Sequence, residues 1–262
     1  MADLNHFSLV LLLLVAPAAG SFLNVLIDRL PRGEDVVRIR SACRGCGARL
    51  TFRDLVPVWS FIALRGRCRT CGSAIPAWHL YVEIAAPGLV LLALLAGNGS
   101  VGGSAGVIWL TALTLWLLLA LGVGDLVWLR LPDALTLGLA CLALALAALT
   151  DGYGSGPALP AAALGAILGA GSFQALRWSY AALTGREGLG LGDVKLMAGI
   201  GALAGPAALP VVVLIGSVLA LVPALARAAL RHQPPARTAR LPFGAALCAA
   251  AFVYWLWRAA AF

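Results

Sequence analysis

The sequence predicts an all-α polytopic membrane protein with about eight transmembrane helices and a small cytoplasmic zinc-ribbon-like loop domain. Hydrophobic residues make up 61% of the 262 residues and charged residues only 11%, a composition that a soluble domain could neither pack nor expose. Several apolar runs approach or exceed the roughly 20 residues that cross a bilayer as a helix. Two Cys-x-x-Cys pairs lie between the first two of these runs. These observations together define the predicted class.

The apolar runs place the expected spans along the chain. They lie near residues 7–27, 80–96, 105–124, 131–149, 158–177, 193–209, 210–226 and 241–257. Glycine and proline crowd the junction of the sixth and seventh spans, so a re-entrant segment is the alternative there. The expected domains are a first transmembrane helix at 1–27, a loop domain at 28–79 and a transmembrane core at 80–262. No internal repeat is visible.

The first run needs a choice between two interpretations. Residues 7–19 resemble the apolar core of a signal peptide, and small residues follow it. However, Lys and Arg are absent upstream, and the run continues to Ile27 and ends in arginine. A retained first span is therefore the prediction.

The arginines predict the orientation. Residues 28–79 carry ten of the eighteen arginines, whereas the links around 97–104 and 150–157 carry none. Because loops on the cytoplasmic side are enriched in Lys and Arg, the 28–79 loop is expected in the cytoplasm. The formal charge of +8 is interpreted as this orienting charge and not as a nucleic-acid-binding surface, since the chain has one lysine and its arginines are clustered.

Four cysteines of the loop predict a structural zinc site. Cys43 and Cys46 form one pair, Cys68 and Cys71 the other, and 21 residues separate the two pairs. Zinc takes four thiolates in a tetrahedron, and four cysteines leave no open position for water. A thioredoxin-like redox pair is disfavoured, because the segment lacks the alternating strand and helix pattern. The remaining cysteines, 141 and 248, lie in apolar runs and are expected to be packing residues.

Acidic residues against apolar spans are the candidate catalytic groups. A carboxylate at the centre of a membrane helix costs about 2.5–3.5 kcal/mol, so each one needs a reason to be there. The candidates, all at the expected cytoplasmic ends of spans, are Glu83, Asp125, Asp133 and Asp193. Gly124 and Gly192 precede two of these aspartates, and a glycine allows a second backbone to approach closely.

Asp125 and Asp193 are expected on the same membrane face, where they can meet. Two aspartates at hydrogen-bonding distance share one proton, so that one activates a water while the other protonates a carbonyl oxygen. This is the chemistry of peptide hydrolysis. The alternatives are a helix N-cap for Asp193 and an ion pair with Arg130 for Asp125.

Four segments of the chain form an ordered set of motifs: residues 20–31 (GSFLNVLIDRLP), 64–72 (LRGRCRTCG), Asp125 with 131–136 (LPDALT), and 190–202 (GLGDVKLMAGIGA). In this order they resemble the motifs of the prepilin peptidases, also called type IV leader peptidases, of the Gly-x-Gly-Asp group of membrane aspartyl proteases. The resemblance implies that Asp125 and Asp193 are the catalytic dyad. It does not carry over to Asp133, which is expected to cap the fourth span after Pro132.

The resemblance also implies a function and a place. The expected enzyme cleaves the leader of type IV prepilins or pseudopilins on the cytoplasmic side of the bacterial inner membrane. Many family members methylate the new N-terminus with S-adenosylmethionine, an activity associated with the cysteine loop. Expected partners are these substrates and the bilayer, with no nucleic acid. The rival interpretations are a peptidase with a purely structural zinc module and a non-enzymatic transporter or scaffold.

Two departures from the family pattern concern residues near these motifs. Val127 stands where the family often has a second aspartate, and residues 55–57 read Leu-Val-Pro where an Asn-Ile-Pro element is usual. Neither removes a member of the dyad. Glu83 matches a family glutamate near the second span, for which a structural or substrate-positioning role is expected.

Overall fold

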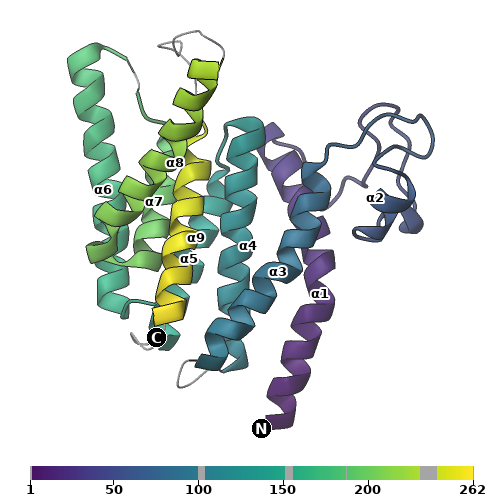
Figure 1. The fold of residues 1–262 in the computed structure, drawn as a ribbon, viewed down its shortest axis with the longest axis horizontal. Coiled ribbons are helices and arrows are strands. Elements are labelled where there is room, and N and C mark those ends of the chain that lie inside the picture. The colour runs from purple at the N-terminus through teal and green to yellow at the C-terminus, as the bar shows by residue number, and fades with distance from the viewer. Residues whose placement is uncertain (1, 100–103, 151–155, 187, 231–240, 262) are drawn as a thin grey trace. The chain divides into compact units, whose positions relative to one another are not determined.

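The computed structural model describes residues 2–99, 104–150, 156–186, 188–230 and 241–261, and these residues form helices joined by short connections (Figure 1). The links around 97–104 and 150–157 lie partly outside these ranges. In chain order the elements are α1 (Ala2–Arg29), η1 (Leu30–Arg32), η2 (Phe52–Asp54), α2 (Trp59–Ala63), α3 (Trp78–Gly99), α4 (Ala105–Trp128), α5 (Asp133–Thr150), α6 (Leu159–Thr184), α7 (Leu191–Ala204), η3 (Pro206–Ala208), α8 (Leu209–Leu230) and α9 (Phe243–Ala261).

Seven helical segments are long and apolar enough to cross a membrane. Within the described ranges they are Ser8–Arg32, Trp78–Leu95, Ala105–Trp128, Asp133–Thr150, Leu159–Thr184, Pro206–Leu230 and Phe243–Ala260. The predicted all-α membrane class is confirmed.

The eighth predicted span, 193–209, differs from expectation. It is the 14-residue helix α7, about 21 Å long at 1.5 Å per residue, against a hydrocarbon core of about 30 Å. The apolar run continues beyond the helix, but Gly205 at φ 80° and the following proline end it. Nine residues of α7 are buried, on all of its faces. It is therefore a core helix of the bundle.

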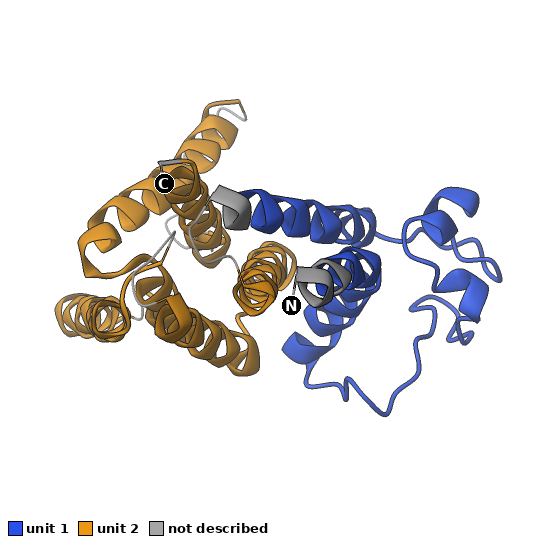
Figure 2. Cartoon of the chain, turned by 90° about the horizontal axis from the view of Figure 1, so that it is seen from below, with its two compact units in different colours: residues 1–95 blue, residues 96–262 orange. Residues whose placement is uncertain are grey.

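The chain divides into two compact units, residues 1–95 and residues 96–262 (Figure 2). The first unit groups the cysteine loop with the two helices that flank it. The second unit contains α4 to α9, and both candidate aspartates belong to it.

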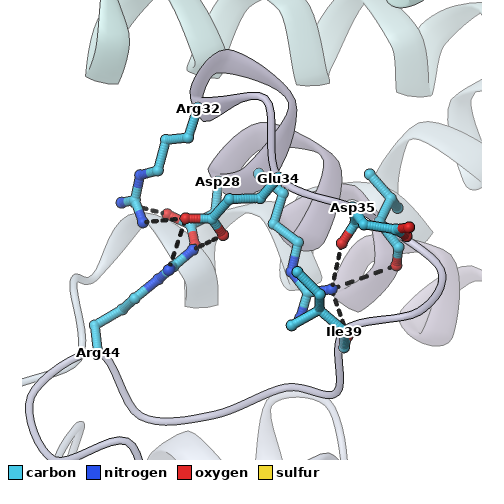
Figure 3. Close-up of polar contacts among 8 residues, drawn as sticks. Asp28, Arg32, Glu34, Asp35, Ile39 and Arg44 are labelled. Carbon is cyan, nitrogen blue, oxygen red and sulfur yellow. Dashed lines mark hydrogen bonds and ion pairs between the residues drawn. The ribbon is translucent and has the colours of Figure 1, made fainter.

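A buried arginine holds the start of the loop in the first unit. Arg29, the last residue of α1, is 6% exposed. Its Nη1 donates to the carbonyl oxygens of Asp35 at 3.1 Å, Val36 at 3.4 Å and Ile39 at 2.6 Å (Figure 3). The guanidinium thus wraps residues 35–39 around the end of the helix. These hydrogen bonds replace water for a charged group that burial would otherwise destabilise.

An exposed ion-pair network ties the first cysteine pair to the same place. Arg44 contacts Asp28, at the end of α1, and Glu34 at 2.7 Å, and Arg32 contacts Asp28 at 2.8 Å (Figure 3). Arg44 lowers the pKa of Glu34 by hydrogen bonding to its carboxylate. Since the pairs are partly exposed, they orient the loop more than they stabilise it.

Glu83 joins α3 to a turn of the loop. Its Oε2 accepts the N–H of Val58 at 2.7 Å, and the Nδ2 of Asn24 on α1 donates to the carbonyl of His79 at 3.0 Å. Val58 has φ 63° and ψ −51°, and the N–H of Trp59 donates to the carbonyl of Pro57 at 2.6 Å. This is the rare γ-turn with positive φ, which is strained for a β-branched residue. Glu83 therefore has a structural role in seating the turn.

In the second unit α7 packs among α5, α6 and α9. Its contact with α6 depends on glycine: a Cβ at Gly165 would strike the carbonyl of Gly201, and a Cβ at Gly201 would strike that of Gly165. One turn along α6, a Cβ at Gly169 would strike the carbonyl of Met197. Such Gly-xxx-Gly spacing lets helix backbones touch in membranes. It also fixes the position of α7 and of the aspartate near its start.

We expect Gly165→Ala to destabilise this packing by about 1–3 kcal/mol, because the added methyl group forces two backbones apart. The measurement is the thermal unfolding midpoint in detergent. Gly171→Ala on the same helix is the matched control, since a Cβ there meets nothing within 4 Å. Equal midpoints for the two variants would contradict the prediction.

Candidate active site and metal centre

Asp125 lies in the last turn of α4 and is 6% exposed. The helix ends because Leu129 takes a left-handed conformation, φ 51°, and its N–H donates to the carbonyl of Asp125 at 2.9 Å. The chain then reverses through Pro132 into α5. The carboxylate is thereby held at one end of the helix bundle, in a largely enclosed position.

Asp193 is the third residue of α7 and is half-buried. The N-cap position is occupied by Gly190, so the N-cap interpretation of Asp193 is wrong. An acidic side chain in the first turn of a helix is stabilised by the partial positive charge there. The short helix thus presents this carboxylate at the end of the bundle where α4 finishes.

The start of α9 brings the two carboxylates together. A Cβ added at Gly244 would lie 3.1 Å from Asp125 Oδ2 and 3.1 Å from Asp193 Oδ1. The two oxygens therefore border the same methyl-sized space. The N–H of Ala245 donates to Asp125 Oδ2 at 2.8 Å. Sequence reasoning did not identify these α9 residues; their only signal was a Pro-x-Gly sequence before the last apolar run.

Leu131 packs beside the dyad and was also missed. A Cβ at Gly192 would lie 3.0 Å from Leu131 Cβ, and one at Gly244 would lie 2.9 Å from Leu131 Cδ1. The space left by Gly192 is thus filled by this leucine. A Cβ at Gly124, in contrast, would meet only a carbonyl at 3.9 Å. Leu131 shields one side of the pair from water, which strengthens the electrostatic interactions there.

Two carboxylates that border one small space disfavour each other's ionisation, which allows the pair to hold a single proton. Such a pair can act at once as a base toward water and as an acid toward a carbonyl oxygen. This is what the arrangement can do chemically.

Asp133 and Lys195 form an ion pair next to this site. Lys195 Nζ lies 2.7 Å from Asp133 Oδ2, with side chains 41% and 74% exposed. Asp133 was expected to cap α5, but it is the first residue of the helix, and the carbonyl of Pro132 before it accepts the first helical hydrogen bonds. Lys195 therefore pairs across helices and not with Asp193, two residues before it.

The four loop cysteines gather into one cluster. Their sulfur atoms all lie within 4.8 Å of one another, and Cys43 Sγ is 3.8 Å from Cys71 Sγ. Four thiolates around zinc at about 2.3 Å have sulfur–sulfur separations of about 3.8 Å. The cluster therefore fits a tetrahedral zinc ion. The other two cysteines lie elsewhere, Cys141 exposed and Cys248 buried.

Two backbone turns of the same design build the cluster. The N–H of Cys43 donates to the carbonyl of Ala48 at 2.9 Å, and that of Gly47 to the carbonyl of Cys43 at 2.9 Å. The second pair repeats this: Cys68 donates to Ser73 at 2.8 Å, and Gly72 to Cys68 at 2.9 Å. Gly47 and Gly72 both have φ 71°, which favours glycine. The loop thus contains a local duplication that was not visible in the sequence.

Ser73 is a further residue of this cluster that sequence reasoning missed. Its Oγ lies 3.4 Å from Cys43 Sγ and 3.1 Å from Cys71 Sγ. The hydroxyl of Ser73, followed by the N–H groups of Cys46 and Gly45, lowers the pKa of Cys43 to about 6. Because metals bind the thiolate, a low thiol pKa favours metal binding at neutral pH.

Comparison with protein families matches both parts of the chain. The bacterial peptidase A24 N-terminal domain matches residues 14–96, which include all four cysteines. The type IV leader peptidase family matches residues 112–225, which include Asp125 and Asp193.

Several curated relatives resemble the chain over most of its length, each bearing the name prepilin leader peptidase/N-methyltransferase. The protein of Aeromonas salmonicida (strain A449) is 36% identical, with 96% of this chain and 91% of the relative covered. That of Burkholderia pseudomallei (strain 1026b) is 36% identical, with coverages of 93% and 82%. That of Pseudomonas putida is 33% identical, with coverages of 91% and 86%. No solved structure matches the chain.

Proposed function

Because the chain belongs to the type IV leader peptidase family, we propose that it is a membrane-embedded aspartic endopeptidase and N-methyltransferase whose catalytic pair is Asp125 and Asp193. Its substrates are type IV prepilins or related pseudopilins. The observation that carries the catalytic assignment is the convergence of the two carboxylates on the space at Gly244. The transporter and scaffold interpretations are not favoured, since the relatives bear enzyme names.

The pair performs hydrolysis with a single shared proton. The ionised carboxylate removes a proton from a water molecule as the water attacks the scissile carbonyl carbon. The protonated carboxylate gives its proton to the carbonyl oxygen. The tetrahedral intermediate then breaks its C–N bond, and the leaving amine takes up the proton that came from water.

Charge within the second unit supports a cytoplasmic position of the dyad. Lys195 and Arg130 lie at the end of the bundle that holds the carboxylates, close to them in sequence. Arg258, at the other end of α9, donates to the carbonyl of Gly156 in the link between α5 and α6 at 3.3 Å. The excess of positive charge at the dyad end is the pattern of cytoplasmic loops.

The zinc loop is the part that we associate with methylation. Cys43, Cys46, Cys68 and Cys71 would hold a structural zinc ion, and the ion would stabilise a loop too small to have a core of its own. The methyl donor is S-adenosylmethionine. On the cytoplasmic side of the inner membrane the loop has access to this soluble compound.

The test is to incubate the purified protein in proteoliposomes with a model prepilin and to weigh the products by mass spectrometry. Without S-adenosylmethionine we expect the leaderless substrate, and with it the same product heavier by one methyl group. Cleavage without any methylation would support the peptidase-only alternative. An intact substrate, with zinc-loaded and folded enzyme, would contradict the proposed function.

A further inference from the structure

We propose that the first turn of α9 determines which role each aspartate of the dyad takes. It stabilises the ionised form of Asp125, which acts as the base, and the shared proton stays on Asp193. The inference rests on the proposed function, because it assigns roles within the same catalytic pair. It adds Gly244 and Ala245 to the site as positioning groups.

A backbone hydrogen bond from Ala245 holds the carboxylate of Asp125. The N–H of Ala245 lies in the first turn of α9, where backbone donors have no partner within the helix. It donates instead to Asp125 Oδ2 at 2.8 Å, between groups that are both buried. N–H donors to a carboxylate favour its ionised form, and they do so more strongly away from water.

The carboxylate of Asp193 has different surroundings from that of Asp125. Asp193 lies in the first turn of its own helix, where the partial positive charge of the helix end favours a carboxylate. Among the described residues, Asp125 accepts a hydrogen bond from the facing helix α9. A hydrogen bond to an ionised carboxylate stabilises it more than the field of a helix end does. The shared proton accordingly resides on Asp193.

Few charged or titratable groups of the described residues lie near Asp125. Within the described ranges, Asp193 from α7 and the buried thiol of Cys248, one turn further along α9, are titratable groups near it. Lys195 is already paired with Asp133. The backbone N–H of Ala245 stabilises the negative charge of Asp125.

Position 244 requires glycine, because the space beside its Cα is bordered by both carboxylates and Leu131. A Cβ there would lie 2.9 Å from Leu131 Cδ1 and 3.1 Å from an oxygen of each aspartate. A methyl group in this small space would keep water and the scissile carbonyl away from the carboxylates. In the reaction Asp125 receives the proton of the water, and Asp193 gives its proton to the carbonyl oxygen. On collapse of the intermediate, Asp125 passes its proton to the amine and Asp193 regains one from the hydroxyl group.

The test removes the N–H of residue 245 and leaves the side chain unchanged. Incorporating lactic acid in place of Ala245 by nonsense suppression converts the amide to an ester, which lacks the donor to Asp125. We expect kcat to fall about 10- to 100-fold with KM for a model prepilin little changed. The acid limb of the rate–pH profile should move to higher pH, because a base with fewer donors loses its ionised form earlier as pH falls.

One control completes the test. Alanine inserted at 245 by the same suppression method retains the N–H and should keep the wild-type profile. A folded ester variant with wild-type kcat and profile would overturn the inference, and so would a lower kcat with an unshifted acid limb. Failure of the dyad assignment itself would appear differently, as normal cleavage by Asp125→Asn or Asp193→Asn.

Discussion

Asp125→Asn and Asp193→Asn are each expected to lower the rate of prepilin cleavage by roughly 10²- to 10⁴-fold, the usual contribution of a general acid or base. Asparagine has nearly the volume of aspartate, and its oxygen can still accept the Ala245 N–H at position 125. It can neither take a proton from water nor carry one to a carbonyl. The double variant should be no slower than either single variant, because the pair acts as a unit.

The measurement is the initial rate of cleavage of a model prepilin in proteoliposomes. Asp133→Asn is the matched control: it lies at the same end of the bundle, its side chain is 74% exposed, and the change breaks only the ion pair with Lys195. Loss of such an exposed pair affects stability by about 0–1 kcal/mol, so its rate should remain close to wild type. A dyad variant that is inserted, folded and still cleaves at the wild-type rate would refute the catalytic assignment.

Cys71→Ser is expected to remove the bound zinc and with it the ordered loop. Serine lacks the thiolate that completes the tetrahedron, and Cys71 contacts both the first cysteine pair and Ser73. Structural zinc supplies roughly 10–16 kcal/mol in isolated zinc-finger peptides, far more than a loop with few buried side chains can replace. We expect loss of methylation, with leader cleavage retained in part because the dyad belongs to the other unit.

Zinc content by elemental analysis and protease sensitivity of residues 40–75 measure this effect. Cys141→Ser is the control, since this exposed cysteine lies on α5 and outside the cluster. It should leave zinc content, methylation and cleavage unchanged. Full zinc content and a protease-resistant loop in the Cys71→Ser protein would contradict the metal site.

The sequence by itself determined the membrane class, because the length and apolarity of a span are local properties that a bilayer imposes on each segment separately. It also identified the four cysteines as a cluster, since zinc selects residue type and spacing that are readable along the chain. The comparison with known proteins confirmed the family that the four ordered motifs indicated. The dyad assignment remains a prediction, now supported by geometry.

The tertiary structure decided what depends on contacts between distant segments. An apolar run suggested a full span at 193–209, but Gly205 and the packing of α7 among three neighbours make it a short core helix. Leu131, Ser73 and the first turn of α9 were missed because their chemistry is ordinary and only their neighbours give them a role. A backbone N–H in particular belongs to every residue but proline, so only the fold can select the one that meets Asp125.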